Sequence, residues 1–269
     1  MSQTREWRYV ADQATVRRDV PGRRRMRRWL RRLVVGVCVV VGLVVLAGGV
    51  LLAATPSVGN AWSVARRQAS SHGAAFPGPP VPHKFSAALI ATEDHRFSAE
   101  PGIDPYAIVR VFWAGITGSK GDQGGATLYQ QLAKLLYTAG QTTGFKSELK
   151  QVALAVKLKY SYTGEQILRM YAGVAYFGHG YYGLEQASCG YYGRMPGKLS
   201  WPQAAVLAGL VQAPSVYDPL LNPSLARSRE VHVFSRLVAT GTITQAEANQ
   251  ALSVPIARLT RGAGGCRAG

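Results

Sequence analysis

Apolar residues recur at helical spacings along most of the chain. After Ser86 they are often separated by three or four positions, as Leu128, Leu132 and Leu135 are. This is the period of an α-helix with one buried face, whereas the two-residue alternation typical of a half-buried strand is scarce. The pattern predicts a mostly α-helical domain.

Two short sequence patterns mark where helices begin. Ser200 is followed three residues later by Gln203, and Thr244 is followed in the same way by Glu247. In such a pair both side chains satisfy backbone N–H groups that the first helical turn leaves open. We interpret the helices of 200–252 as scaffold. The segment between the two starts is predicted to place Val231, Phe234 and Val238 on one face and to end at Gly241.

Residues 33–54 form an apolar run without a charged residue. Its 22 residues, at about 1.5 Å each, suffice to cross a hydrocarbon layer about 30 Å thick. The arginine-rich segment 23–32 comes just before it, which predicts a cytoplasmic N-terminus and a main domain outside the cell. A cleaved signal peptide is the alternative because the small residues Ala53 and Ala54 end the run, although an ordinary signal core has only about 7–15 residues.

The segment 70–84 is rich in Pro, Gly and Ala and has no periodicity, so it is interpreted as an extended connection. This divides the chain into five parts. The predicted parts are a basic, disordered cytoplasmic tail at 1–32, a transmembrane helix at 33–54, a linker at 55–84, the main domain at 85–252 and a C-terminal tail at 253–269.

The formal net charge of +17 is unevenly distributed. Residues 1–32 hold eleven Lys and Arg residues against three acidic ones, and residues 55–269 hold twenty against eleven. The excess in the main domain suits a polyanionic partner or an anionic membrane surface. An exported domain argues against nucleic acid, so pyrophosphate-linked lipids fit better.

The three cysteines give little information about the fold. Cys38 lies inside the apolar run, which leaves Cys189 and Cys266 as the one pair in the main domain. No Cys-x-x-Cys motif or Cys/His cluster indicates a metal ligand set. We expect no structural disulfide.

Two adjacent carboxylates, Glu93 and Asp94, follow a short apolar run that begins at Ala88. A helix over this run would present both at its polar end, one as a base and its neighbour as a supporting charge. Asp104, in a turn-rich segment, adds a third carboxylate. A pair of surface acids beside Arg96 is the competing interpretation.

The paired glycines Gly124 and Gly125 precede a predicted helix with polar side chains on or near one side. Backbone N–H groups at a helix start, together with a cation, form a ready site for an anion. An amphipathic surface helix after a glycine turn explains the pattern equally well. The polar side chains belong to Thr127, Gln130, Gln131 and Lys134.

A third block, 145–188, combines two predicted helices with an aromatic, glycine-rich turn. In this order and spacing the three blocks resemble glycosyltransferase family 51, the peptidoglycan-polymerising module, over about 85–251. The first family motif is met by Glu93, Asp94, Phe97, Gly102, Ile103 and Asp104. The second is met by Gly124, Gly125, Ala126, Thr127, Gln130, Gln131 and Lys134, and the third block agrees through Ile167, Tyr171, 176–178 and 183–188.

The chain also departs from the family pattern. Glu100 stands where a histidine is usual, and Gly164 and Gly173 replace a basic residue and an asparagine. Lys146 and Lys150, shifted in position, would supply cations that the third motif lacks. The arginine, the lysine and the second functional glutamate of that motif correspond to Ser147, Glu148 and Gln151.

The resemblance implies a lysozyme-like helical fold that joins lipid II units into a glycan strand, with inversion and release of polyprenyl pyrophosphate. Glu93 would take the proton of the acceptor hydroxyl, with Asp94 beside it. Cations and hydrogen-bond donors would stabilise the leaving pyrophosphate. The implied substrate-binding residues are Thr127, Gln130, Gln131, Lys134, Lys146, Lys150 and Gln151, and the implied structural residues are Phe97, Gly124 and Gly125.

The resemblance also bears on cofactors and partners. A divalent cation, Mg or Mn, is compatible with the chemistry, but the residues require no cofactor. The expected partners are lipid II, the nascent glycan strand and the membrane. No transpeptidase motif is present, so separate transpeptidases would cross-link the product. Phe112 and Trp113 are predicted either to enter the membrane interface or to fill the core.

Gln151 leaves the activity open. Either Glu93 suffices and the chain is an active polymerase, or the chain is a weakened family member that binds lipid II or glycan at the membrane. A lytic glycosidase on the same fold is a third possibility. The predicted anion site argues against it, because a hydrolase has no pyrophosphate to hold.

Overall fold

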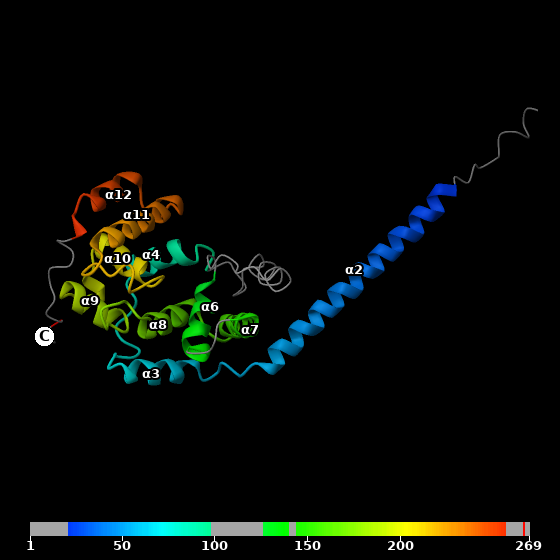
Figure 1. The fold of residues 1–269 in the computed structure, drawn as a ribbon, viewed down its shortest axis with the longest axis horizontal. Helices are drawn as coiled ribbons and strands as arrows, with labels where there is room; N and C mark the ends of the chain where they lie inside the picture. The colour runs from blue at the N-terminus through cyan, green and yellow to red at the C-terminus, as the bar shows by residue number, and fades with distance from the viewer. Residues whose placement is uncertain (1–20, 98–125, 140–143, 257–265, 267–269) are drawn as a thin grey trace, which may run out of the picture. The chain divides into compact units, whose positions relative to one another are not determined.

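The computed structural model describes residues 21–97, 126–139, 144–256 and 266. The chain divides into two compact units, Met1–Val50 and Leu51–Gly269. The described residues form helices, and an antiparallel bridge between Tyr176 and Tyr182 is isolated from any named strand. The prediction of a mostly α-helical chain with an apolar N-terminal helix is confirmed (Figure 1).

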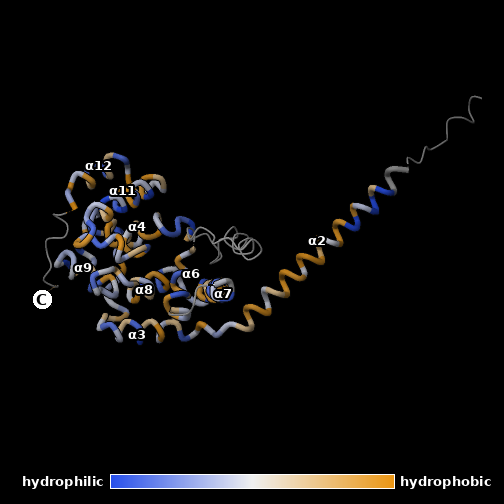
Figure 2. Tube along the Cα trace, in the orientation of Figure 1, coloured by the Kyte–Doolittle hydropathy of each residue, from blue (hydrophilic) through white to orange (hydrophobic). Residues whose placement is uncertain are grey.

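The N-terminal helix, α2, extends over Pro21–Ala54. Its part Arg25–Ala54 is long and apolar enough to cross a membrane. Figure 2 shows hydrophilic turns giving way to this apolar stretch. The helix begins at Pro21 and not at Leu33, so the arginine-rich end of the predicted disordered tail is helical. Arginine is a good helix former, which agrees with a helix over this stretch.

A helix, α3 (Ala61–Ser71), lies within the segment predicted to be a linker. Its alanines Ala61, Ala65 and Ala69 are spaced by four residues and are fully or almost fully buried. Such short side chains let α3 approach its neighbours closely, but they give only a weak hydrophobic pattern in the sequence. The linker prediction is therefore wrong for 61–71.

The segment before α3 is tied to the domain by side chains from later in the chain. The Lys157 ammonium donates to the carbonyl oxygens of Thr55 at 2.6 Å and Pro56 at 3.1 Å. The Tyr162 hydroxyl donates to the carbonyl oxygen of Val58 at 2.9 Å. These contacts fix where the chain enters the second unit.

Further helices build the rest of the second unit. They are α4 (His83–Glu93), α6 (Leu128–Ala133), the π-helix η1 (Lys134–Thr138), α7 (Phe145–Ser161), α8 (Gly164–Val174), α9 (Leu184–Tyr192), the 3₁₀ turn η2 (Pro196–Lys198), α10 (Trp201–Leu210), α11 (Pro223–Ala239) and α12 (Gln245–Leu252).

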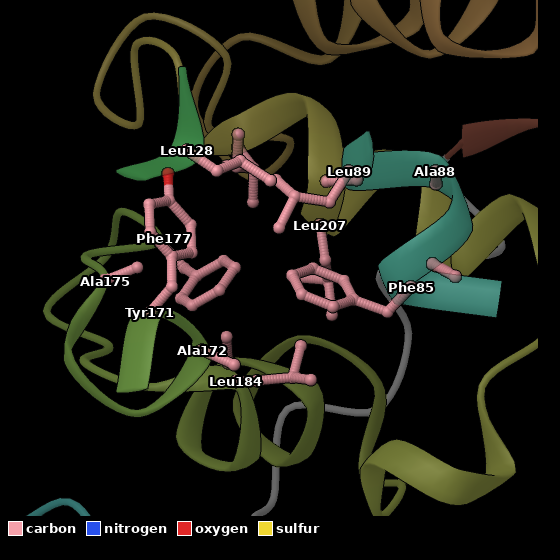
Figure 3. Packing of buried hydrophobic residues seen from close by; sticks show 14 of the residues in the cluster. Phe85, Ala88, Leu89, Leu128, Tyr171, Ala172, Ala175, Phe177, Leu184 and Leu207 are labelled. Carbon is pink, nitrogen blue, oxygen red and sulfur yellow. The ribbon is translucent and has the colours of Figure 1, made fainter. Parts of the chain in front are cut away.

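The helix α10 lies at the centre of this unit. Every residue from Pro202 to Leu210 is buried, and α10 contacts both α4 and α11. A helix buried on all sides must be apolar almost all round, as this one is, because its buried polar residue Gln203 is taken up by the capping box at the helix start. Figure 3 shows Leu207 of α10 packed with Phe85 and Leu89 of α4. The central helix thereby fixes the positions of α4 and α11.

The predicted helix starts at Ser200 and Thr244 are confirmed, because both residues form complete capping boxes. The predicted end of α11 is also confirmed, since Gly241 follows it with φ +69°. The predicted buried face of α11 is only partly right. Val231 is 45% exposed, and the buried positions are Ala226, Glu230, Val233, Phe234 and Leu237.

A disulfide joins Cys189 of α9 to Cys266, with the two Cα atoms 4.9 Å apart. The expectation of no structural disulfide was therefore wrong. The two cysteines are separated by 77 residues in the sequence, and nothing in the local pattern around either one indicates that folding brings them together. Only the tertiary structure pairs them.

We expect Cys266→Ser to lower the free energy of unfolding by about 4 kcal/mol, because a long closed loop restricts the unfolded chain. Denaturant unfolding of the full-length protein in detergent, without reductant, measures this. Cys38→Ser is the matched control, since Cys38 is a free cysteine outside the second unit. Equal unfolding midpoints for wild type and Cys266→Ser would contradict the prediction.

Glu230 is a buried acid on α11. Its Oε2 accepts from Arg227 at 2.7 Å, and its Oε1 is buried without a hydrogen-bond partner among the described residues. Burial raises the pKa of Glu230 to about 7, although Arg227 opposes that shift. Arg227 also donates to the carbonyl oxygens of Leu252 and Val254, and so ties the end of α12 to α11.

This raised pKa makes stability depend on pH. Protonation of Glu230 favours the folded state. This contribution to the free energy of unfolding is fully present below the ordinary pKa of 4.5 and is lost as the pH rises through about 7. We expect a loss on the order of 2–3 kcal/mol over this range. Glu230→Gln should flatten that part of the pH profile in denaturant unfolding at pH 4.5 and pH 8. An unchanged profile would show that Glu230 is not responsible.

Candidate active site

Glu93 is the last residue of α4. The helix buries Phe85, Ala88, Leu89 and Ala91 in the core, and the backbone leaves the helical conformation at the next residue, with φ −157° and ψ 68°. The buried apolar residues of α4 thus anchor the helix in the core, and the Glu93 carboxylate lies at its polar C-terminal end. This is the arrangement that the sequence predicted.

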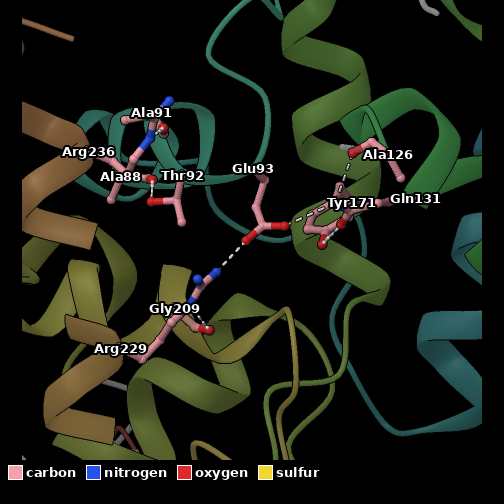
Figure 4. A network of polar contacts seen from close by, with 10 residues as sticks. All are labelled: Ala88, Ala91, Thr92, Glu93, Ala126, Gln131, Tyr171, Gly209, Arg229 and Arg236. Atoms are coloured by element: carbon pink, nitrogen blue, oxygen red, sulfur yellow. Dashed lines mark hydrogen bonds and ion pairs between the residues drawn. The ribbon is translucent and has the colours of Figure 1, made fainter. Parts of the chain in front are cut away.

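Both oxygens of the Glu93 carboxylate are engaged (Figure 4). Oε1 accepts from Nη2 of Arg229 at 2.6 Å, and Oε2 accepts from Nε2 of Gln131 at 3.1 Å. The side chains of Arg229 and Glu93 are only 10% and 11% exposed, so water screens their attraction weakly. Glu93 therefore lies between a cation on one side and an amide on the other.

Gln131 is oriented by a buried phenol. Its Oε1 accepts from the Tyr171 hydroxyl at 2.8 Å, which leaves Nε2 to face Glu93. Burial, and to a smaller extent the charge of Glu93, raise the pKa of Tyr171 far above its ordinary value. The phenol is therefore protonated and acts as a donor. This chain of contacts brings together α4, α6 and α8.

Arg229 comes from α11 and was missed by the sequence interpretation, which treated that helix as scaffold. Its Nε donates to the carbonyl oxygen of Gly209 at 3.2 Å, and its guanidinium lies 5.7 Å from the ring centre of Tyr217. A Cβ on Gly209 would be 2.9 Å from Cγ of Arg229, so the close passage favours glycine there. The available signal in the sequence was an arginine four residues before the apolar Val233, a spacing that places both on one face of a helix.

A second arginine of α11 contacts the same end of α4. Nε of Arg236 donates to the carbonyl oxygen of Ala91 at 3.2 Å. Burial, together with the charges of Arg229 and Arg236, lowers the pKa of His232 between them. A cation at the C-terminal end of a helix is also favoured by the helix dipole. The wall of α11 beside Glu93 is therefore positively charged.

Asp94, the predicted supporting carboxylate, is buried and has a structural contact. Its Oδ2 accepts from the backbone N–H of Leu128 at 2.9 Å. Leu128 is the first residue of α6, so the carboxylate satisfies one of the open donors of that helix. Asp94 thereby fastens the end of α4 to the start of α6, and its predicted catalytic role stays a prediction.

Thr127 and Gln130, predicted to bind substrate, form a capping box at the start of α6. The Thr127 hydroxyl accepts from the Gln130 backbone N–H at 3.2 Å, and Gln130 Oε1 accepts from the Thr127 N–H at 3.1 Å. Both residues are buried, whereas Lys134 is exposed at the first position of η1. Lys134 is thus better placed than Thr127 or Gln130 to meet an anion from solvent.

Gln151 lies on α7. Its Nε2 donates to the hydroxyl oxygens of Thr138 at 3.1 Å and Ser147 at 3.3 Å. An amide can donate both of these bonds, whereas an ionised carboxylate only accepts. Within the described ranges, no hydrogen bond joins Gln151 to Glu93. On the same helix Lys146 is exposed and Lys150 is partly exposed.

Two departures from the family pattern are explained by packing. A Cβ on Gly173 would be 2.8 Å from Cδ2 of Phe76, so the ring occupies the space of an asparagine side chain. A Cβ on Gly164 would be 3.1 Å from Cε1 of Phe97. Phe97 is buried and stacks on Tyr129 with ring centres 4.9 Å apart. Glu100, Asp104, Phe112, Trp113, Gly124 and Gly125 lie outside the described residues.

In the part of the chain that the structure describes, no group of three or more His, Cys, Asp or Glu residues could hold a metal ion. Around Glu93 both carboxylate oxygens are already bonded to Arg229 and Gln131. A divalent cation at Glu93 would have to displace one of these two partners.

A family model described as Transglycosylase matches residues 62–238 of the chain. The chain belongs to the transglycosylase family. The resemblance to glycosyltransferase family 51 is thus confirmed. The match begins inside α3, which agrees with the burial of that helix and places the start of the domain before residue 85.

Relatives of this transglycosylase include larger proteins. Penicillin-binding protein 1A of Streptococcus oralis is 38% identical over 180 residues, which are 65% of this chain and 28% of that protein. The Aquifex aeolicus protein of the same name is 35% identical over 65% of this chain and 24% of its own length. A Cupriavidus necator protein, provisionally named a transglycosylase, is 33% identical over 65% of this chain and 75% of its own. The chain thus corresponds to about a quarter of the two penicillin-binding proteins.

The Glu93–Arg229 pair can be tested by a double-mutant cycle with Glu93→Gln and Arg229→Met, the second of which keeps the apolar stem. We expect a coupling energy of about 2 kcal/mol in denaturant unfolding, because the pair is poorly screened. The same cycle with Glu93→Gln and the exposed Arg194→Met is the control. Coupling near zero for the first cycle would mean that the two charges do not interact.

Proposed function

We propose that this transglycosylase polymerises lipid II into glycan strands, with inversion at the anomeric carbon and release of polyprenyl pyrophosphate. The observation that carries the proposal is the placement of Glu93. In a transglycosylase domain it lies at the end of α4, with Gln131 of the second motif and two arginines of α11 beside it.

Glu93 would act as the base. The acceptor sugar hydroxyl must lose its proton as its oxygen attacks the donor, and a carboxylate within hydrogen-bond reach can take it. Arg229 and Gln131 hold the carboxylate in place, and Tyr171 orients Gln131. For this role the carboxylate must exchange one of its present hydrogen bonds for the substrate hydroxyl.

The leaving pyrophosphate needs positive charge, since its departure creates an anion. Lys134 is an exposed cation three residues after Gln131, and Arg229 and Arg236 add positive charge from α11. Lys146 and Lys150 of α7 are further candidates. Lysine and arginine side chains of this chain would therefore stabilise the leaving pyrophosphate, as the basic residues of the family motif are expected to do.

Location and partners follow from the same proposal. The helix α2 would anchor the chain in a membrane with its arginine-rich end in the cytoplasm. The second unit would then lie outside the cell, where the Cys189–Cys266 disulfide is chemically stable. Lipid II and the nascent strand would be met at the membrane surface.

A second candidate function is supported by Gln151. If polymerisation needs a second carboxylate, this chain would bind lipid II or glycan at the membrane without turning it over. The amide of Gln151 is committed to two hydroxyl groups and offers no negative charge. Wild-type protein that is folded and binds lipid II, yet forms no polymer, would favour this function.

We expect Glu93→Gln to reduce polymer formation by about a hundredfold or more, since the amide cannot take the proton. Full-length protein in detergent is incubated with lipid II, and glycan chain length is measured on gels. Glu165→Gln, an exposed change on α8, is the matched control. Polymer that persists in Glu93→Gln would remove Glu93 as the base. Cleavage of preformed glycan by the wild type would instead indicate a lytic enzyme.

A further inference from the structure

A cavity of about 780 Å³ lies in the second unit, apart from the Glu93 contacts. Its walls come from the segment 73–81, the turn 181–183 and the helices α8 and α9. Arg169, Ala172 and Gly173 of α8 line it, whereas Tyr171 of the same helix contacts Gln131. Its volume is in the range of small-molecule sites, about 300–1,000 Å³.

The aromatic walls of the cavity are held in place by packing. Tyr182 stacks on His72 with ring centres 3.6 Å apart and planes 5° from parallel. Tyr181 lies across Gly190, where a Cβ would be only 2.2 Å from Cζ of the ring. Since both rings are fixed by neighbours within the protein, the apolar surface of the cavity is preformed.

Arg169 places a positive charge in the wall. Its Nη2 donates to the carbonyl oxygen of Gly78 at 3.4 Å, which is a long bond. Its Nε is buried and has no hydrogen-bond partner among the described residues. None of the described acids forms an ion pair with it. Since the buried Nε is closed to a ligand, the terminal Nη groups, whose one hydrogen bond to a described residue is the long bond to Gly78, are the donors left to receive a carboxylate.

Glu185 places a negative charge in the same cavity. A Cβ built on Gly78 would be 3.8 Å from Oε2 of Glu185, and the carbonyl of that glycine is the partner of Arg169. The two charges therefore both approach Gly78 without pairing with each other. Gln186, by contrast, is satisfied by the backbone of His72 and Tyr182.

We propose that this cavity binds the zwitterionic end of an amino acid, with its carboxylate at Arg169 and its ammonium group at Glu185. The apolar part of the ligand would lie against the prolines and tyrosines of the walls. Two sources offer this chemistry, a free amino acid and a peptide branch on a glycan strand. The second source rests on the proposed function.

The experiment uses full-length protein in detergent and isothermal titration calorimetry. The probe is a synthetic tripeptide ending in 2,6-diaminopimelate, whose side chain carries an amino group and a carboxylate on one carbon. We expect binding, and at least a tenfold loss when either side-chain group is capped, by acetylation or amidation. Absence of binding, or no effect of capping, would overturn the proposal.

Free diaminopimelate distinguishes the two sources. Affinity equal to that of the tripeptide supports a free amino acid as ligand, and a tenfold weaker affinity supports a peptide branch. Glu93→Gln should still bind the tripeptide, because Glu93 does not line the cavity. If the wild-type protein binds the tripeptide but forms no polymer from lipid II, that result would count against the proposed function alone.

Variants of the two charged residues test the assignment. Arg169→Gln and Glu185→Gln should each weaken tripeptide binding at least tenfold, while the exposed controls Arg194→Gln and Glu165→Gln leave it unchanged. Ala75→Trp adds an independent check, since Ala75 is exposed at the cavity wall and a large ring there should block entry without disturbing the core. Undiminished binding in Ala75→Trp would overturn the cavity as the site.

Discussion

The ion pair between Glu93 and Arg229 depends on the buried helix α10. The pair joins α4 to α11, whose two residues are 136 positions apart in the sequence. Both helices pack on α10, and Gly209 of that helix lets the arginine stem pass closely. A buried carboxylate without such a partner would be costly. The candidate site therefore exists only where the core sets these two helices side by side.

The side of Glu93 that faces Gln131 is formed by α6 and α8, again through both local and distant contacts. The capping box of Thr127 and Gln130 starts α6, and Asp94 fastens that start to the end of α4. Gln131 is then turned toward Glu93 by the buried Tyr171. Several motif residues thus position other residues, which is a physical reason for their presence that does not require contact with a substrate.

The departures from the family pattern are accommodated by their surroundings. Phe76 fills the space beside Gly173, Phe97 lies against Gly164, and Gln151 donates to two hydroxyl groups. At Gly173 the consequence extends beyond packing, because that glycine also lines the cavity that holds Arg169 and Glu185. Glycine in place of the family's asparagine at position 173 of α8 therefore also helps to form this cavity.

Local signals in the sequence determined the helical class, the apolar N-terminal helix, the capped starts at Ser200 and Thr244 and the position of Glu93 at the end of α4. These features depend on residues a few positions apart. The tertiary structure alone decided the burial of α3, the Cys189–Cys266 pair and the role of Arg229. Each of these requires segments distant in sequence to meet, and neither an alanine stripe, a lone cysteine nor an arginine on a helix shows by itself which partner it will find.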